Sequence, residues 1–459
     1  MTNINFAFLW TDILIYCLLL VVGLYIWRAR SKEHLAAPWR KVARRPMAMA
    51  SAVVLFAFLA IGLLDSVHFR EALPNQKPGA STEYSLEVIS QLDRFLKPLR
   101  TQTEKTYSAP LAIQLYAMES MEQPDGRTLR GHPRLKHGGA HLGTDGERRH
   151  SDVLWLVAQG TLIALLSLCA LLIGVGQRVT WRALLHGETD LPWRTILFTL
   201  GGLLWIVCVL WLLAPKYHVF GTDKVGQDVL YLSLKSIRTG LVIGTLTTLV
   251  MLPFALWLGV MAGYFKGWVD DVIQYVYTTL NAIPDVLLIA AAVLMMQVYM
   301  DINKDAFASI TERADFRLLF LCLILGITSW TGLCRLLRGE TLKLTEIDYV
   351  QAAQAFGVSH WKIMSRHILP NVMHIVLITV TLQFSSLVLA EAVLAYVGVG
   401  VDPTMHSWGN MINSARLELA REPIVWWPLA AAFVFMFALV LAANLFADAV
   451  RDAFDPRSE

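Results

Sequence analysis

Charge is scarce in this chain. Only 16% of its 459 residues are Asp, Glu, Lys or Arg, whereas soluble domains carry about 25%. Hydrophobic residues make up 56% of the chain and the mean hydropathy is +0.51, so the composition is that of a membrane protein. The formal net charge of +3 is too small to indicate nucleic-acid binding, and we expect no nucleic-acid partner.

Cysteines and catalytic motifs are also scarce. The five cysteines lie in or at the ends of apolar runs without paired spacing, so we interpret them as small hydrophobic side chains rather than disulfides or metal ligands. The sequence has no Gly-x-x-x-x-Gly-Lys-Ser/Thr phosphate loop, and we do not expect this chain to hydrolyse ATP itself. It also shows no legible Ser/His/Asp or Cys/His arrangement. We therefore predict no catalytic residue, no cofactor and no enzyme activity.

Long apolar runs dominate what is present. A backbone inside lipid must satisfy its own hydrogen bonds, so each run long enough to span a bilayer is expected to be a helix. The expected spans are residues 5–27, 47–65, 153–175, 195–214, 237–262, 283–300, 316–334, 371–398 and 424–446. The sequence therefore predicts an all-α, polytopic membrane protein with about nine transmembrane helices.

Basic residues predict how these spans are oriented. The segment between the first two spans has seven basic residues and one acidic residue, a net charge of about +6. They are Arg28, Arg30, Lys32, Arg40, Lys41, Arg44 and Arg45 against Glu33. Short basic loops remain cytoplasmic, which predicts an external N-terminus, a cytoplasmic C-terminus and an external location for the polar segment 66–151.

The polar segment 66–151 is expected to be either a small folded cap or partly disordered. Residues Tyr84 to Arg100 show helical periodicity, which predicts a helix. Leu111, Ile113 and Leu115 alternate with polar or small residues, a weak indication of a strand.

Histidines are frequent in the same segment. His137 and His141 have the i,i+4 spacing of a helical metal site, but Gly138 and Gly139 disfavour the helix that this spacing needs. We therefore favour a solvated loop and predict no metal site.

A polar island, residues 345–371, separates two of the long apolar runs. Val350, Ala353 and Phe356 share one face of a short amphipathic helix. Gly357 follows directly, at a position where glycine commonly ends a helix. A short helix that ends in a bend between two membrane spans provides a binding surface for a soluble partner.

This island resembles the cytoplasmic coupling loop of permease subunits of ATP-binding-cassette (ABC) importers. The family motif is Glu-Ala-Ala, three residues, Gly, and later Leu-Pro. The matching positions here are Gln351, Ala352, Ala353, Gly357, Leu369 and Pro370. The resemblance implies that these residues, with Asp348, bind an ATPase subunit. Gln351 stands where the family has Glu, so it keeps an acceptor oxygen but lacks the charge.

A second motif is similar to the His-x-x-Gly-Thr-Asp-x-x-Gly-Arg-Asp signature of the dipeptide/oligopeptide branch. The matching positions are His218, Gly221, Thr222, Asp223, Gly226 and Asp228, and Gln227 replaces the Arg. We expect Asp223 and Asp228 to cap the helix that begins near Val229. The role expected for this motif is structural, at the periplasmic gate.

Two further stretches resemble the same branch. Trp408 and Gly409, within Ser407-Trp408-Gly409, are assigned with the gate. The turn at Gly263–Asp271 also matches, with Lys266 where glycine is usual.

Acidic residues within spans are costly and often functional. Glu391 lies mid-span, and Asp285 follows Pro284 near the start of a span. They could line a pathway for cationic groups of a substrate, or form hydrogen bonds between helices. Both interpretations stay open.

The resemblance covers about 240 residues, from near His218 to the C-terminus. It implies a type I permease core of six helices over residues 195–459, with a coupling loop at 335–370. Residues 1–65 would then add two helices, 66–151 an external insertion, and 152–194 a further helix with a cytoplasmic loop.

The implied function is that of a permease subunit in a binding-protein-dependent importer, with peptides as the expected substrates. It would pair with a second, homologous permease in the lipid of a bacterial inner membrane. Two ATPase subunits would hold the 346–362 helix and drive alternating access, and a periplasmic substrate-binding protein would deliver the substrate.

Two other functions remain as alternatives. An ion-coupled secondary transporter predicts several intramembrane acids and matching hydrophobic repeats, of which few acids and no clear repeat are present. A membrane-anchored interaction or sensing protein would act through the 66–151 insertion.

Overall fold

The computed structural model describes most of the chain. The described residues are 4–72, 84–85, 87–122, 128–143, 145–177, 190–303, 307 and 309–454. Within them, nine helices are long and apolar enough to cross a membrane, which confirms the predicted number. They are α1 (Trp10–Arg30), α3 (Pro46–Asp65), α6 (Arg149–Gly176), α8 (Trp193–Leu213), α9 (Val229–Phe265), α11 (Asp285–Ile302), α12 (Ile310–Thr345), α15 (Leu369–Val397) and α17 (Trp427–Phe454).

The chain forms two compact units. The first unit consists of Met1–Ala7, Ala43–Thr239 and His406–Ala442. The second unit consists of Phe8–Val42, Gly240–Met405 and Ala443–Glu459.

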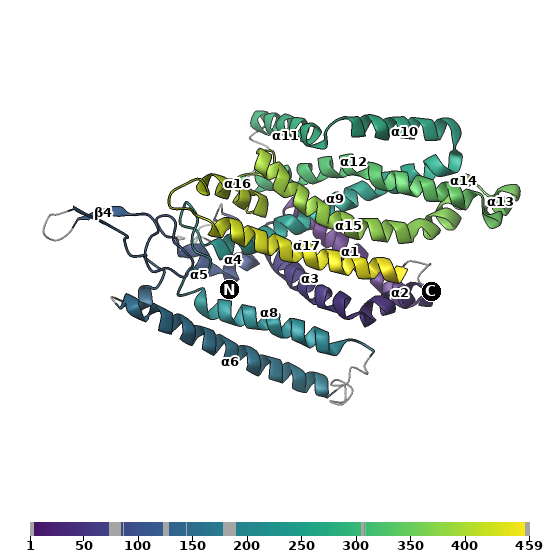
Figure 1. Cartoon of the computed structure of the whole chain (residues 1–459). Coiled ribbons are helices and arrows are strands. Elements are labelled where there is room, and N and C mark those ends of the chain that lie inside the picture. Colours follow the sequence, from purple (N-terminus) through teal and green to yellow (C-terminus); the bar gives the residue numbers. More distant parts are fainter. Residues whose placement is uncertain are drawn as a thin grey trace, which may run out of the picture. The chain divides into compact units, whose positions relative to one another are not determined.

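Helices α6 and α8 pack side by side in the first unit, and α3 packs against α8 (Figure 1). Glycine allows the close approach: a Cβ atom on Gly160 would lie 2.9 Å from the Cα of Val209. Trp205 adds a hydrogen bond from its Nε1 to the Thr161 hydroxyl, at 3.0 Å. Small residues and interhelical hydrogen bonds hold helices together in lipid, where the hydrophobic effect does not.

Short elements of the first unit build a domain on the ends of these helices. Strand β2 (His68–Glu71) pairs antiparallel with β1 (Ile4–Phe6) and β3 (Ile89–Ser90), and β4 (Glu119–Glu122) pairs with β5 (Thr128–Gly131). The helical elements are α4 (Gln91–Phe95), α5 (Lys97–Thr101), the 3-10 turns Ala140–Leu142 and Gly146–Arg148, and α16 (Trp408–Glu418).

The predicted helix over Tyr84–Arg100 is wrong in extent. Helix α4 begins only after Ser90, whose hydroxyl accepts from Asp93 N at 3.1 Å while the Asp93 carboxylate accepts from Ser90 N at 2.9 Å. This capping box fixes the start of the helix, and Pro98 lies in the first turn of a second helix, α5. Leu86 lies outside the described residues.

The strand suggested by the alternation at Leu111, Ile113 and Leu115 is also wrong. Around this segment the described residues form only an isolated bridge, between Gln114 and Arg134. The apolar side chains of Leu111 and Ile113 instead pack on the buried cluster of Leu156, Leu213 and Tyr217.

Helix α12 is central to the second unit, where it packs against α1, α11 and α15. The remaining helices there are α2 (Glu33–Arg44, of which residues 33–42 belong to this unit), α10 (Gly267–Ala282), α13 (Asp348–Ala355), α14 (His360–Ile363) and a π-helical turn, Met364–Ile368. A Cβ atom on Gly263 would lie 2.6 Å from the Cβ of Thr341, so α9 and α12 approach closely at this level.

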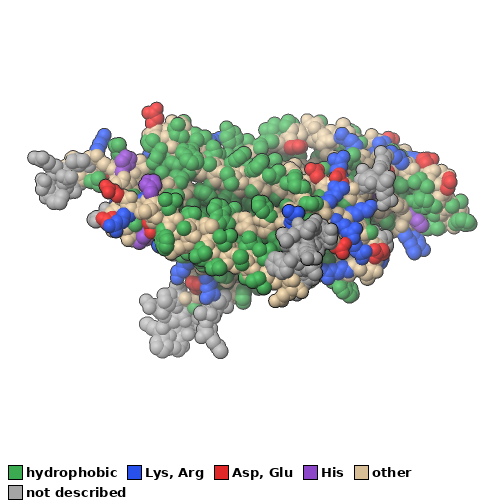
Figure 2. Space-filling model, turned by 60° about the horizontal axis from the view of Figure 1, so that its bottom comes forward, with side chains coloured by type: hydrophobic (Ala, Val, Ile, Leu, Met, Phe, Trp, Pro, Cys, Tyr) green, Lys and Arg blue, Asp and Glu red, His purple; other side chains and the backbone are tan. Residues whose placement is uncertain are grey.

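The spanning helices carry an apolar surface. Figure 2 shows hydrophobic side chains over much of the visible face, with charged side chains gathered outside that area. Phe198 is 86% exposed and Trp211 63% exposed, on a helix that is apolar all round. Exposed aromatic side chains on such a helix fit contact with lipid.

The contact at Gly160 makes a testable prediction. Gly160→Leu places a side chain against the α8 backbone, and overpacking of this kind costs about 1–3 kcal/mol. The thermal midpoint of the detergent-purified protein should fall. Gly174→Leu on the same helix is the matched control, because no atom lies within 4 Å of its Cβ position. Equal midpoints for the two variants would contradict the α6–α8 packing.

Candidate functional site

The polar island forms two short helices joined by a bend. The predicted 346–362 helix is therefore not continuous: α13 ends at Ala355, and α14 begins at His360. Gly357 between them has φ +70°, and its N–H donates to Gln354 O at 2.9 Å. No atom lies within 4 Å of a Cβ built on Gly357, so the left-handed backbone, rather than lack of space, requires glycine.

One apolar side chain anchors this loop to the second unit. Val350 of α13 is fully buried, in one cluster with Ile363, Met364 and Ile368. Phe356 was expected on the same helical face but is 87% exposed, because the chain turns away at the end of α13. Trp361 of α14 is 58% exposed. Val350 thus anchors the loop in the apolar cluster, while the side chains of Phe356 and Trp361 are exposed.

Polar contacts fix the base of the loop. Arg338 of α12 donates from Nε and an Nη to the two carboxylate oxygens of Asp270, at 2.5 and 2.6 Å. These hydrogen bonds lower the pKa of Asp270. The Tyr264 hydroxyl lies 2.8 Å from Nδ1 of His360, and so ties α9 to the start of α14.

Lys266 has an unusual backbone in the turn between α9 and α10. Its φ is +55°, a conformation that costs a non-glycine residue about 1–3 kcal/mol. Its Nζ lies 2.6 Å from a carboxylate oxygen of Glu346, just before α13. The side chain thus adds an ion pair to the loop that a glycine at this turn would lack.

The second motif forms a buried ionic cluster in the first unit. His218 is 2% exposed; its Nδ1 donates to Asp228 at 2.7 Å, and its Nε2 lies 3.4 Å from Glu104. Burial lowers the pKa of His218, but the hydrogen bonds to Asp228 and Glu104 outweigh it and raise the pKa to about 9. The ring is therefore an imidazolium between two carboxylates at neutral pH.

Glu104 comes from the insertion, and the sequence patterns did not indicate it. Its carboxylate accepts from the backbone N–H groups of Lys136, His137 and Gly138, at 2.8, 2.7 and 3.0 Å. Burial raises its pKa, yet the contact with His218 and these N–H groups lower it to about 2. No local spacing signals a contact made across more than 100 residues.

The insertion and the motif also share backbone contacts. Glu104 N donates to Gly226 O at 2.9 Å, and a Cβ atom on Gly226 would lie 1.9 Å from Glu104 O. The Thr222 hydroxyl accepts from Ser108 N at 2.7 Å and donates to Thr106 O at 2.8 Å. The insertion thus lies directly on the motif.

The two motif acids have different roles. Asp228 caps α9, since its carboxylate accepts from Leu230 N at 2.8 Å. Asp223 was expected to cap the same helix, but it accepts from Val225 N and Gln227 N within its own turn, at 3.0 and 2.8 Å. Gly221 begins this turn with φ +71°.

Trp408 and Gly409 are buried at the start of α16. Trp408 Nε1 donates to Ser233 O of α9 at 3.2 Å. The Ser407 hydroxyl caps α16 by accepting from Asn410 N at 2.9 Å. These residues connect α16 to the first turns of α9 within the first unit.

A second ionic cluster, also unexpected from the sequence, surrounds Lys235 of α9. Its Nζ lies 2.6 Å from Asp65 and 3.1 Å from Asp93. The Tyr231 hydroxyl donates to Asp93 at 2.7 Å. Burial raises the pKa of Asp93, but Lys235 and the hydrogen bonds from Ser90 and Tyr231 lower it to about 2.

Comparison with known proteins identifies the family. Residues 255–459 match the family model described as "Binding-protein-dependent transport system inner membrane component". The glutathione transport system permease protein GsiD of Pectobacterium atrosepticum is 32% identical over 241 residues, which cover 52% of this chain and 73% of that protein. The chain belongs to this family. It is a permease subunit of an ABC importer and a multi-pass inner-membrane protein.

Two more relatives agree with this assignment. The oligopeptide transport system permease protein OppC of Mycobacterium bovis is 31% identical over 243 residues, which cover 52% of this chain and 76% of that protein. The dipeptide transport system permease protein DppC of Lactococcus lactis subsp. cremoris is 29% identical over 241 residues, 52% of this chain and 64% of that protein. A transport subunit, not an enzyme, is therefore the established class, and an ion-coupled transporter is not favoured.

The two intramembrane acids of the permease lie in different surroundings. Glu391 is buried in α15, with 3% exposure. Asp285 is exposed and is the first residue of α11. Whether either contacts substrate stays a prediction.

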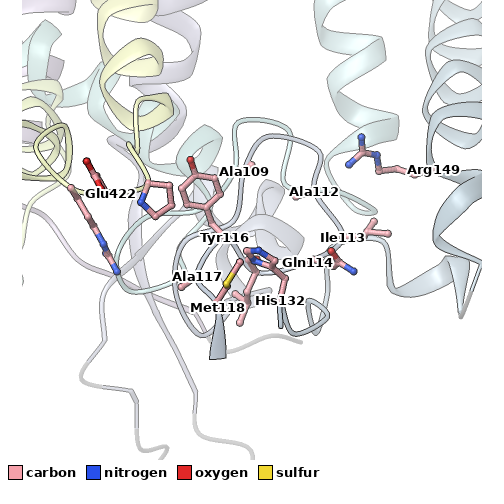
Figure 3. A pocket seen from close by; sticks show the side chains of 13 residues that line it. Ala109, Ala112, Ile113, Gln114, Tyr116, Ala117, Met118, His132, Arg149 and Glu422 are labelled. Carbon is pink, nitrogen blue, oxygen red and sulfur yellow. The ribbon is translucent and has the colours of Figure 1, made fainter. Parts of the chain in front are cut away.

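A cleft of about 790 Å³ lies in the first unit of the permease. Insertion residues 109–118 form one side of it, and Arg421–Pro423 from the α16–α17 connection another. Figure 3 shows Tyr116 pointing toward the loop that holds Glu422, and its hydroxyl donates to Ile424 O at 3.0 Å. Residues of the 109–118 segment therefore shape the surface beside the α16–α17 connection.

The buried position of Glu104 makes a prediction. Glu104→Ala leaves the His218 imidazolium and three N–H groups without this acceptor, and breaking a buried ion pair costs about 3–5 kcal/mol. We expect a marked loss of thermal stability and faster proteolysis of the insertion. Glu119→Ala is the control, because Glu119 pairs with the exposed Lys105, and such pairs contribute about 0–1 kcal/mol. Similar losses for both variants would refute the ionic cluster.

The pKa of His218 predicts a pH dependence. Folding raises this pKa from 6.5 to about 9, so its stabilisation is fully present below pH 6.5 and is lost as the pH rises through about 9. The thermal midpoint of the wild-type protein should fall over this interval. His218→Gln should be less stable and should lack this part of the pH dependence. Parallel midpoint curves for the two proteins would count against a charged His218.

Proposed function

We propose that this permease imports peptides with energy supplied by ATPase subunits that bind the α13–α14 loop. The observation that supports this most is the loop's combination of a buried anchor, Val350, with an exposed aromatic pair, Phe356 and Trp361. A rigid support with exposed aromatic side chains is the typical form of a binding hot spot. The proposed contact residues are Asp348, Gln351, Ala352, Ala353, Gly357, Leu369 and Pro370.

The contact with the ATPase would depend on shape more than on charge. Gln351 lacks the negative charge of the family's Glu, and its Nε2 donates to Glu346 O at 3.3 Å. Phe356 is among the most exposed apolar side chains of the second unit. An apolar cleft on the ATPase that accepts Phe356 would compensate for the missing ion pair.

The remaining partners follow from the family. A second, homologous permease would complete the pathway, two ATPase subunits would bind the pair, and a substrate-binding protein would deliver the substrate. Closure of the ATPases would switch the pathway from an inward-open to an outward-open state. The switch requires that ligands such as ATP bind one of the two states more tightly than the other. The basic segment 28–46 supports a cytoplasmic side for the loop, with the N-terminus outside and the C-terminus inside.

Peptides are the proposed substrate class. The relatives named above carry glutathione, dipeptide or oligopeptide transport in their names. These share a backbone amide and charged termini, so a common pathway for short, linear, polar solutes is a consistent proposal. The outer motif, His218 to Asp228 with Trp408 and Gly409, would position the periplasmic gate.

Phe356→Ala tests the coupling proposal. ATP-dependent uptake of a labelled peptide in proteoliposomes should fall at least about tenfold, because tenfold corresponds to about 1.4 kcal/mol and the loss of a hot spot costs more than that. The thermal midpoint should stay unchanged because Phe356 is exposed. Gly357→Arg should uncouple ATP hydrolysis from uptake in the same assay. Met118→Ala, an exposed apolar residue of the insertion, is the control and should transport normally. Normal uptake by Phe356→Ala and Gly357→Arg would reject the proposal.

A further inference from the structure

A cluster of cations lies where the chain leaves and re-enters the membrane between α1 and α3. Seven basic residues and one acidic residue occupy positions 28–45. The basic ones are Arg28, Arg30, Lys32, Arg40, Lys41, Arg44 and Arg45. All but Arg45 are exposed, so the charge of this segment is displayed on the surface.

The position of helix α2 relative to the bilayer follows from the two spanning helices that it connects. It has 12 residues, which gives a length of about 18 Å, too short to cross the hydrocarbon core. It connects two spanning helices, whose ends lie at the membrane boundary. Helix α2 therefore lies in or close to the layer of lipid headgroups, whichever side of the membrane this is.

The two faces of α2 differ in chemistry. Val42 is 3% exposed, and the Trp39 ring packs edge-on against Phe454 with centroids 5.4 Å apart. The apolar face is thus used within the protein. Arg40 and Lys41 are exposed, so another side of the helix presents charge.

Two arginines of this segment pair with exposed acids. Arg40 pairs with Glu33 at 2.7 Å and Arg44 with Asp190 at 3.1 Å. The acid side chains of these pairs are 74% and 90% exposed, and ion pairs this open contribute only about 0–1 kcal/mol. A phosphate can compete for such arginines, because guanidinium binds phosphate with two hydrogen bonds.

We propose that α2 and its flanking cations bind the headgroups of anionic phospholipids. A run of four to eight basic residues directly beside a membrane span is the typical form of such a site. The site would hold the α1–α3 end of the permease to an anionic leaflet. It is independent of the imported substrate and of the ATPase contact.

The test uses the full-length purified protein and native mass spectrometry with phosphatidylglycerol and phosphatidylcholine. Arg40→Gln/Lys41→Gln removes two cations and should raise the apparent Kd for phosphatidylglycerol at least about fivefold, because the loss of even one headgroup-level cation costs about that much. Affinity for phosphatidylcholine should not change. Arg40→Lys/Lys41→Arg keeps both charges and should keep the affinity.

The control variant is Arg130→Gln/Lys136→Gln, which removes one exposed Arg and one exposed Lys from the insertion and should leave phosphatidylglycerol binding unchanged. Raised salt should weaken phosphatidylglycerol binding to the wild type, because exposed charges are screened. An unchanged Kd in Arg40→Gln/Lys41→Gln, or an equal change in the control, would overturn the proposal. If Arg40→Gln/Lys41→Gln lost its co-purifying ATPase but kept its affinity for phosphatidylglycerol, α2 would be assigned to a protein contact. That result would also overturn the lipid proposal.

Discussion

A backbone that crosses lipid must satisfy all its own hydrogen bonds, and the rest of this structure depends on that constraint. This constraint makes the spanning segments helical, and the polar and charged side chains that can contact partners lie mainly at the helix ends. Both motifs occur at such ends: the α13–α14 loop between α12 and α15, and the His218 cluster before α9. The helices supply rigid supports, and the connections between them supply the groups that partners can contact.

The His218 cluster shows how this permease has incorporated its insertion. An imidazolium with a carboxylate on either side requires Glu104 from the insertion as much as Asp228 from the family motif. The glycine of the motif, Gly226, leaves no room for a side chain because the insertion's Glu104 carbonyl lies there. Glu104 and its neighbours therefore pack directly on the turn that precedes α9. The charges that this contact buries would otherwise remain without partners.

The sequence predicted what is periodic or local. Apolar runs located the nine spans in the described part of the chain, and the position of Gly357 after a short apolar face located the end of α13. The Tyr84–Arg100 helix was wrong because side-chain capping at Ser90 and Asp93 overrode the periodicity. Phe356 is exposed because it follows the end of α13 at Ala355, where the chain turns at Gly357.

What the sequence could not predict depends on distant contacts. Glu104 and His218 are 114 residues apart, and Lys235 is 170 residues from Asp65. Nothing in the local composition around Glu104 or Lys235 distinguishes them from solvated charges. The roles of the individual site residues likewise remain predictions, since they concern contacts with partners and not the chain alone.

The most direct test of the account is the composition of the assembly that contains this permease. The tagged, full-length protein would be isolated from native membranes without crosslinking, and the mass of the intact complex measured together with its subunits. The account predicts two phosphate-loop ATPases and a second, related permease bound to the chain. A homo-oligomer, or the chain alone, from membranes in which those subunits are present would contradict it.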